Sequence, residues 1–286
     1  MKPMSIIVII SLLTWLGTSC DCPMNRIQGQ GEPMIKYYNP GSFETIVSDH
    51  IIDVEYACSD TFAVKLEAQP NLIEFIEIYV NQERLHIDVK EGINLHPTSR
   101  LKVYIDMPDI RSLQINGTGS IINTHPFDSI DKLDIMIKGT GNATCQWLTA
   151  ENLTLSINGT GDISTRGNTS HLFAEIDGTG DITYSGSSEE AIVNSDGTGN
   201  CFFYGNSVYL KLLLNGTGDF YGRDFSTRNA DVYVDGPGDA EVFATESLTA
   251  TIKGSGNVFC YGNPQWEVEN DGCGDFILQS SGREVR

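Results

Sequence analysis

The chain has little positive charge. It holds 18 lysine and arginine residues against 38 aspartate and glutamate residues, so its formal net charge is −20 over 286 residues. A surface of this sign repels the phosphates of nucleic acids, and we expect no nucleic-acid partner. The sequence also lacks helical periodicity of useful length after residue 20, and no stretch reaches 18 consecutive apolar residues. We therefore expect neither a helical fold nor a membrane-spanning helix.

The patterns of common enzymes and metal sites are missing as well. The seven cysteines form no Cys-x-x-Cys pair and no zinc pattern, and no Gly-x-Ser-x-Gly motif is present. Histidines fall at unrelated positions, and basic residues are scattered. We therefore predict no catalytic, cofactor-binding or metal-binding residues and a protein that is not an enzyme. A polysaccharide-active β-helix enzyme is the alternative. Cys145, Cys201 and Cys260 are expected as small buried hydrophobes.

The N-terminus resembles a targeting segment. Lys2 precedes an apolar stretch, Ile6–Leu16, that is too short to span a membrane. The sequence Leu16-Gly17-Thr18-Ser19-Cys20 then resembles the lipobox of bacterial lipoproteins, in which the cysteine is acylated. We expect a signal peptide over residues 1–19, lipidation at Cys20 and a flexible tether over residues 20–41. An ordinary cleaved secretion signal with an incidental cysteine is the alternative.

A Gly-x-Gly signature recurs nine times, with starts 18 to 22 residues apart, and six copies read Gly-Thr-Gly. A fixed period near 20 residues is typical of a solenoid, in which each repeat forms one rung. We expect the glycines to form structural corners, because glycine accepts positive φ and lets backbones stack closely. The glycines of the first six corners are Gly117, Gly119, Gly139, Gly141, Gly159, Gly161, Gly178, Gly180, Gly197, Gly199, Gly216 and Gly218.

Apolar residues alternate with polar ones on both sides of each corner, as in strands with one buried face. Each rung is therefore predicted to hold a strand, a corner and a second strand, with a return loop such as Gly167–His171. Each strand must pair with its own copy one period later. This pairing predicts an all-β fold, a single-stranded right-handed parallel β-helix of about nine rungs. We expect the domain over residues 42–280, with irregular first rungs over Ser42–Pro108 that cap the solenoid, and a polar tail over residues 281–286.

Polar residues flank each corner and should form two columns along the solenoid. Asp162, Asp181 and Asp219 directly follow the second glycine of their corners. Aspartate and asparagine side chains commonly bond nearby backbone in turns, which is the interpretation we favour. A column of calcium ions is the alternative, because cations would cancel the repulsion between carboxylates about 4.8 Å apart.

Exposed aromatic residues could bind sugars by stacking. The alternation places Tyr184 and Phe203 inward, and Tyr204 and Tyr221 outward, so the second pair is the better candidate. Separately, Asp128-Ser129-Ile130 resembles the three-residue O-glycosylation signal used in the envelope of some Gram-negative anaerobes.

A lipobox-like signal followed by strands and repeated Asn/Asp-Gly-Thr-Gly corners resembles the auto-transporter adhesin head domain family, the GIN domain family. The resemblance covers about residues 42–280. It implies a right-handed β-helix of a bacterial envelope, with no catalytic residues. We expect a non-catalytic cell-envelope lipoprotein that serves as an adhesin-like binding or scaffold module. Its partners would be the membrane, through a lipid on Cys20, and a glycan or protein ligand. We expect it in the outer membrane, on the periplasmic or surface side.

Overall fold

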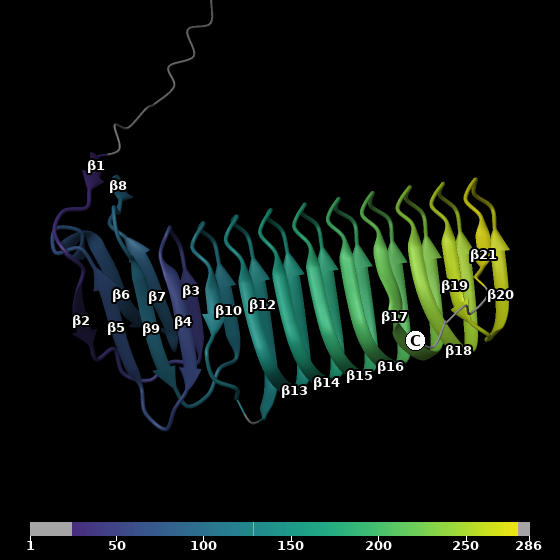
Figure 1. The fold of residues 1–286 in the computed structure, drawn as a ribbon, viewed down its shortest axis with the longest axis horizontal. Helices are drawn as coiled ribbons and strands as arrows, with labels where there is room; N and C mark the ends of the chain where they lie inside the picture. The colour runs from purple at the N-terminus through teal and green to yellow at the C-terminus, as the bar shows by residue number, and fades with distance from the viewer. Residues whose placement is uncertain (1–24, 128, 280–286) are drawn as a thin grey trace, which may run out of the picture.

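The computed structural model describes residues 25–127 and 129–279, and in these residues it is all-β apart from one 3₁₀ turn, Ile73–Phe75. Figure 1 shows a long stack of strands in which successive rungs follow one another from the N-terminal to the C-terminal end. The predicted β-solenoid is therefore confirmed. No helix in the described ranges is long and apolar enough to cross a membrane.

The centre of the solenoid consists of six long strands, one in each rung. Each bends across two faces and pairs in parallel with its copies in the neighbouring rungs. The predicted return loop at Gly167–His171 is wrong, because these residues lie inside a strand and Thr169 pairs with Ser188 of the next rung. The six strands are β13 (Ala143–Ile157), β14 (Ile163–Ile176), β15 (Ile182–Ser195), β16 (Cys201–Leu214), β17 (Phe220–Val234) and β18 (Ala240–Ile252).

Shorter strands continue the stack at both ends of this central part. On the N-terminal side they are β10 (Ser112–Ile115), β11 (Ile121–Asn123) and β12 (Ile130–Ile137). On the C-terminal side they are β19 (Val258–Gly262), β20 (Gln265–Asn270) and β21 (Phe276–Leu278). Strands β19 and β20 together pair with the two halves of β18, and β21 pairs with β19.

Strand register builds the core as columns of apolar side chains. Ile163 pairs with Ile182, which pairs with Cys201, and all three side chains are buried. Burial confirms the expectation for the cysteines and raises the pKa of the Cys201 thiol to about 12. The alternation of buried and exposed residues along each strand follows from the two-residue period of side chains in an extended chain.

The N-terminal end mixes parallel and antiparallel pairing. Strands β3 (Thr45–Ser48) and β4 (Asp53–Cys58) extend the solenoid in parallel, whereas antiparallel strands join it on the outer side. The predicted irregular first rungs are therefore only partly rungs, because the β6–β7 hairpin and other antiparallel strands complete this end. The remaining strands are β5 (Ala63–Ala68), β6 (Ile76–Asn81), β7 (Arg84–Val89), β8 (Ile93–His96) and β9 (Lys102–Met107).

Two strands lie where the sequence predicts a flexible tether. β1 (Asn25–Gln28) pairs with β8, and β2 (Met34–Tyr38) pairs antiparallel with β5. The Asn71 side chain also bonds the backbone of Gln28 and Gln30. The tether expectation is wrong for residues 25–38, because β-sheet pairing outweighs their polar, proline-containing composition. The predicted signal peptide, the predicted lipidation site Cys20 and the predicted tail lie outside the described residues, as does Asp128.

Candidate functional site

The glycine corners are explained by the spacing between rungs. A Cβ atom built on Gly178 would overlap the carbonyl oxygen of Gly159 in the rung before, and one on Gly180 would overlap that of Gly161. The φ angles of these corner glycines lie outside the left-handed region, so the expected positive φ is wrong. Glycine is needed because the backbones of successive rungs approach too closely for any side chain. The same overlap recurs at all nine corners.

The column after each corner forms a ladder of hydrogen bonds, here called the Asx ladder. The backbone N–H of Asp181 donates to Oδ1 of Asp162 at 2.9 Å, and that of Asn200 donates to Oδ1 of Asp181 at 2.7 Å. The ladder begins at Asp53, passes through Ser120 and Asn142 and ends at Asp275. Each side chain satisfies a backbone donor of the next rung, which explains why this column contains acceptors.

The Asx ladder accounts for the acidic residues without metal ions. Asn and Ser residues take the same position as Asp in the ladder, so an acceptor is what the position requires. In the part of the chain that the structure describes, no group of three or more histidine, cysteine, aspartate or glutamate side chains is arranged to hold a metal ion. The hydrogen bonds of the Asx ladder agree with the interpretation that these side chains bond backbone groups.

A second set of glycines lies on the opposite bend of the rungs. Gly167, Gly186 and Gly205 occupy equivalent places in β14, β15 and β16, which are adjacent in Figure 1. They line an open groove of about 580 Å³, here called the glycine groove. A Cβ on any of them would overlap a carbonyl of the preceding rung. The rest of the groove is lined by Trp147, Leu148, Thr149, Arg166, Asn168, Ser185, Ser187 and Asn206.

Trp147 stands at the N-terminal end of the glycine groove in an unfavourable backbone conformation. Its φ angle is 55°, in the left-handed region, and its side chain is 57% exposed. It is the unpaired residue of a bulge in β13, since Gln146 pairs with Arg166 and Leu148 pairs with Gly167. Bulges re-aim side chains, and the left-handed conformation costs a residue such as Trp roughly 1–2 kcal/mol. The structure thus holds a large indole in solvent at an energetic cost.

The polar groups around Trp147 are mostly uncommitted. Asn168 is satisfied, because its Oδ1 accepts the backbone N–H and the hydroxyl of Ser187. By contrast, the side chains of Arg166, Ser185 and Asn206 form no hydrogen bond or ion pair with other residues of the described ranges. No carboxylate lines the glycine groove, so Arg166 gives it a positive charge within a strongly acidic chain. The glycine groove combines an exposed aromatic face with free donors and acceptors, as ligand sites do.

The sequence predicted correctly which aromatic side chains near the glycine groove point into the core and which point to solvent. Tyr184 and Phe203 are buried, and Tyr204 and Tyr221 are exposed, as the alternation predicts. Tyr221 is largely engaged: its ring stacks on Phe202 with centroids 5.0 Å apart, and its hydroxyl donates to Asp219 at 2.9 Å. That bond to a carboxylate raises the pKa of Tyr221. Tyr204 directly precedes Gly205 at the rim of the glycine groove.

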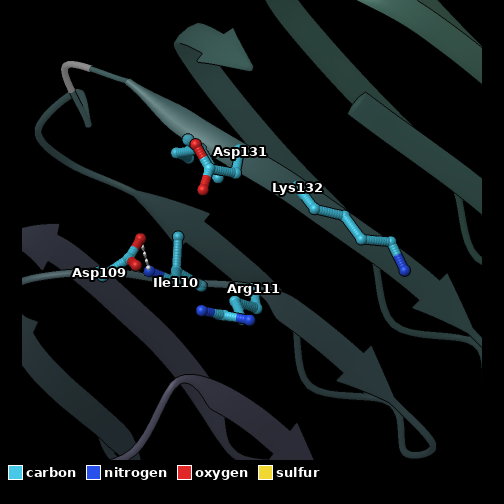
Figure 2. A pocket seen from close by; sticks show the side chains of 6 residues that line it. Asp109, Ile110, Arg111, Asp131 and Lys132 are labelled. Atoms are coloured by element: carbon cyan, nitrogen blue, oxygen red, sulfur yellow. Dashed lines mark hydrogen bonds between the residues drawn. The ribbon is translucent and has the colours of Figure 1, made fainter. Parts of the chain in front are cut away.

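A second cavity, near the start of the solenoid, is too small for a ligand. It has a volume of about 60 Å³, and Figure 2 shows Asp109, Ile110, Arg111, Asp131 and Lys132 around it. Most of its charged groups are engaged elsewhere: Asp109 accepts the N–H of Ile110 at 2.8 Å, and Arg111 contacts Glu44 at 2.6 Å. Lys132 points away and pairs with Asp134. Such a space holds one or two water molecules.

The glycine groove was not predicted from the sequence. A signal for it was present, because Gly167, Gly186 and Gly205 follow one another at intervals of 19 residues. These glycines stand alone and lack the Gly-x-Gly form, and Gly167 was expected in a return loop. The exposure of Trp147 depends on a one-residue bulge, which no periodic pattern reveals.

Comparisons with known proteins identify related sequences and folds. The family model described as "Putative auto-transporter adhesin, head GIN domain" matches residues 42–199 and 172–264. A Parabacteroides distasonis protein described as a putative adhesin has a similar structure, with a TM-score of 0.70 and 21% identity over 89% of this chain and 100% of that one. Comparison with curated proteins finds no match.

Two further structures share the fold. A Parabacteroides distasonis protein described as a putative lipid binding protein has a TM-score of 0.69 and 22% identity, over 90% of this chain and 100% of that one. A putative adhesin of Parabacteroides merdae has a TM-score of 0.66 and 20% identity, over 89% of this chain and 99% of that one. Likeness at this level of identity establishes the fold and leaves the ligand open.

Proposed function

Because the chain belongs to the family described as putative auto-transporter adhesin, head GIN domain, we propose that it is a non-catalytic, adhesin-like binding module of the bacterial cell envelope. The observation that carries this proposal is the glycine groove. It offers an exposed indole and unpaired polar side chains on a rigid stack of strands. The solenoid holds these groups in fixed places, which lowers the entropy lost on binding.

The groove supports binding better than it supports catalysis. Hydrolysis of a glycosidic bond generally uses two carboxyl groups, one on each side of the bond. The residues that line the glycine groove include no aspartate or glutamate, and Arg166 is their one charged residue. The glycine groove therefore lacks the two carboxyl groups that a polysaccharide-cleaving enzyme generally uses.

A binding screen beside a turnover assay tests the proposal. Purified protein would be applied to a panel of glycans and host-matrix proteins, and the same polysaccharides would be assayed for cleavage products. We expect saturable binding without product release. Product formation that single carboxylate substitutions abolish would overturn the proposal in favour of an enzyme. Absence of binding to the whole panel would also count against it.

The proposal includes a lipid anchor at Cys20 that holds the module at the outer membrane. Its support is the lipobox-like segment before that cysteine. Replacement of Cys20 by Ser in the expressed full chain is expected to move the protein from the membrane fraction to the soluble fraction, as measured by cell fractionation. Continued membrane fractionation of the Cys20→Ser chain would contradict the anchor and leave the binding role untouched.

A further inference from the structure

We propose that the glycine groove binds an acidic glycan, with Trp147 stacked on a pyranose ring and Arg166 paired with the carboxylate of the sugar. This inference rests on the proposed binding function and names its ligand class. It depends on three features: the position of Trp147, the uncommitted polar groups beside it, and the charge of the groove relative to the rest of the chain.

The position of Trp147 favours a flat, partly apolar ligand. A pyranose ring has a face of C–H groups and a rim of hydroxyls, so an indole can cover the face while polar neighbours reach the rim. Trp147 is held in the open by its bulge rather than folded onto the protein. An outlying backbone conformation that exposes a large aromatic ring points to a role in binding.

The floor and sides of the groove suit the hydroxyls of a sugar. Gly167, Gly186 and Gly205 carry no side chains, so a ligand can approach the backbone closely along three rungs. Ser185 and Asn206 offer hydroxyl and amide groups that can both donate and accept hydrogen bonds. Neither side chain is engaged with other described residues, so binding breaks no internal hydrogen bond.

The charge of the groove selects a ligand with a carboxylate. Arg166 has no acidic partner in the described ranges, although the chain carries 38 aspartate and glutamate residues. A guanidinium group binds a carboxylate through two parallel hydrogen bonds, which makes an acidic sugar the fitting partner. The net charge of −20 at the same time repels polyanions, so we infer a glycan with isolated carboxylates rather than a densely charged chain.

The test compares matched carboxylated and neutral pyranose oligosaccharides on an array, followed by titration calorimetry with the strongest carboxylated binder. Trp147→Gly removes the indole and relieves the left-handed conformation, so this variant is expected to melt at or slightly above the wild-type temperature yet bind at least about tenfold more weakly. Arg166→Met is expected to remove the preference for the carboxylated over the neutral oligosaccharide. Trp266→Gly and Arg223→Met are controls, because they alter exposed residues outside the groove and should bind normally.

The outcomes separate this inference from the proposed function. Wild-type binding that Trp147→Gly leaves unchanged overturns the groove assignment while the binding module stands. Equal affinity for neutral and carboxylated oligosaccharides, with no effect of Arg166→Met, overturns the acidic ligand. If no oligosaccharide on the array binds but a matrix protein does, the inference fails alone. If nothing binds, or products are released, the proposed function fails with it.

Discussion

At the scale of single residues, two kinds of side chain hold neighbouring rungs together. The corner glycines allow the backbones to approach, and the acceptors of the Asx ladder then satisfy the backbone donors that this approach leaves at the bend. The two features depend on each other, because a larger corner residue would separate the rungs and lengthen the ladder bonds. The backbone of the preceding rung therefore limits which residue can occupy each corner position and each ladder position.

A methyl group at a central corner should therefore destabilise the fold. Gly178→Ala places a Cβ against the Gly159 carbonyl oxygen, and overpacking of this kind costs about 1–3 kcal/mol. We expect a lower melting temperature, measured by circular dichroism. Gly92→Ala is the contrasting variant: Gly92 has a φ of +76° and nothing near its Cβ, so it reports the cost of a left-handed dihedral angle, which Gly178 does not carry. A Gly178→Ala chain that melts at or above the wild-type temperature would refute the stacking explanation.

The Asx ladder makes a separate prediction at Asp181. Asp181→Asn keeps the oxygen that accepts the Asn200 N–H, so stability should be unchanged or slightly raised as repulsion along the column decreases. Asp181→Ala removes the acceptor and should cost about 1 kcal/mol. Melting is measured with and without calcium and with a chelator. A chelator that lowers the wild-type midpoint by several degrees would show that the column holds metal ions after all.

Some residue-level features followed from the sequence and others did not. The inward direction of Tyr184 and Phe203 was predictable because side chains alternate strictly along a strand. The conformation of the corner glycines was predicted wrongly, since the need for glycine comes from contact with the rung before rather than from φ. The exposure of Trp147 was not predicted, because a bulge interrupts the alternation of inward and outward side chains at that residue.

At the scale of elements, the antiparallel strands at the N-terminal end differ in kind from the rungs. Strands β6 and β7 pair antiparallel through a tight turn in which Gln82 and Glu83 have φ angles of 49° and 60°. The turn was predictable from Asn81-Gln82-Glu83-Arg84, because polar residues interrupt two apolar runs. The pairing of β1 and β2 was not predictable, because these strands join partners distant in sequence. Strands of four and five residues are also too short to give a periodic signal.

The β6–β7 turn can be stabilised by one substitution. Two positive φ angles in a two-residue hairpin loop favour glycine at the second position. Glu83→Gly should relieve the left-handed conformation and raise the free energy of unfolding by up to about 1 kcal/mol, as measured by denaturant titration. Glu91→Gly, at an exposed neighbouring turn, is a control for loss of charge. A clear loss of stability in Glu83→Gly would indicate that this side chain supports the hairpin.

At the scale of the whole molecule, the stability of the solenoid is approximately the sum of the contacts between neighbouring rungs. Strand β15 pairs with β14 and β16, and its period is 19 residues, from Ile182 to Cys201. A rung therefore depends on the two rungs beside it and on little else. The glycine groove is a property of this scale, since four successive rungs, β13 to β16, create it and no single repeat contains it.

Removal of one full period should leave the fold intact. Deletion of residues 182–200 brings β14 against β16 with all columns in register, so we expect a folded chain with a cooperative melt and a shorter groove. Deletion of residues 182–191 is the control, because it places the next corner out of register and should prevent folding. The two deletion chains are compared by far-ultraviolet circular dichroism and size-exclusion chromatography. Equal loss of structure in both chains would contradict the nearest-neighbour description.

The Asx ladder also has a direction. At each step the later residue donates its backbone N–H to a side chain of the earlier rung, from Ser120 onto Asp53 through to Asp275 onto Asn257. Each new rung thus meets acceptors that the previous one has already put in place, so the folded part acts as a template for the next segment. A chain that enters its compartment N-terminus first can fold vectorially, behind the antiparallel strands at its N-terminal end, without waiting for its C-terminus.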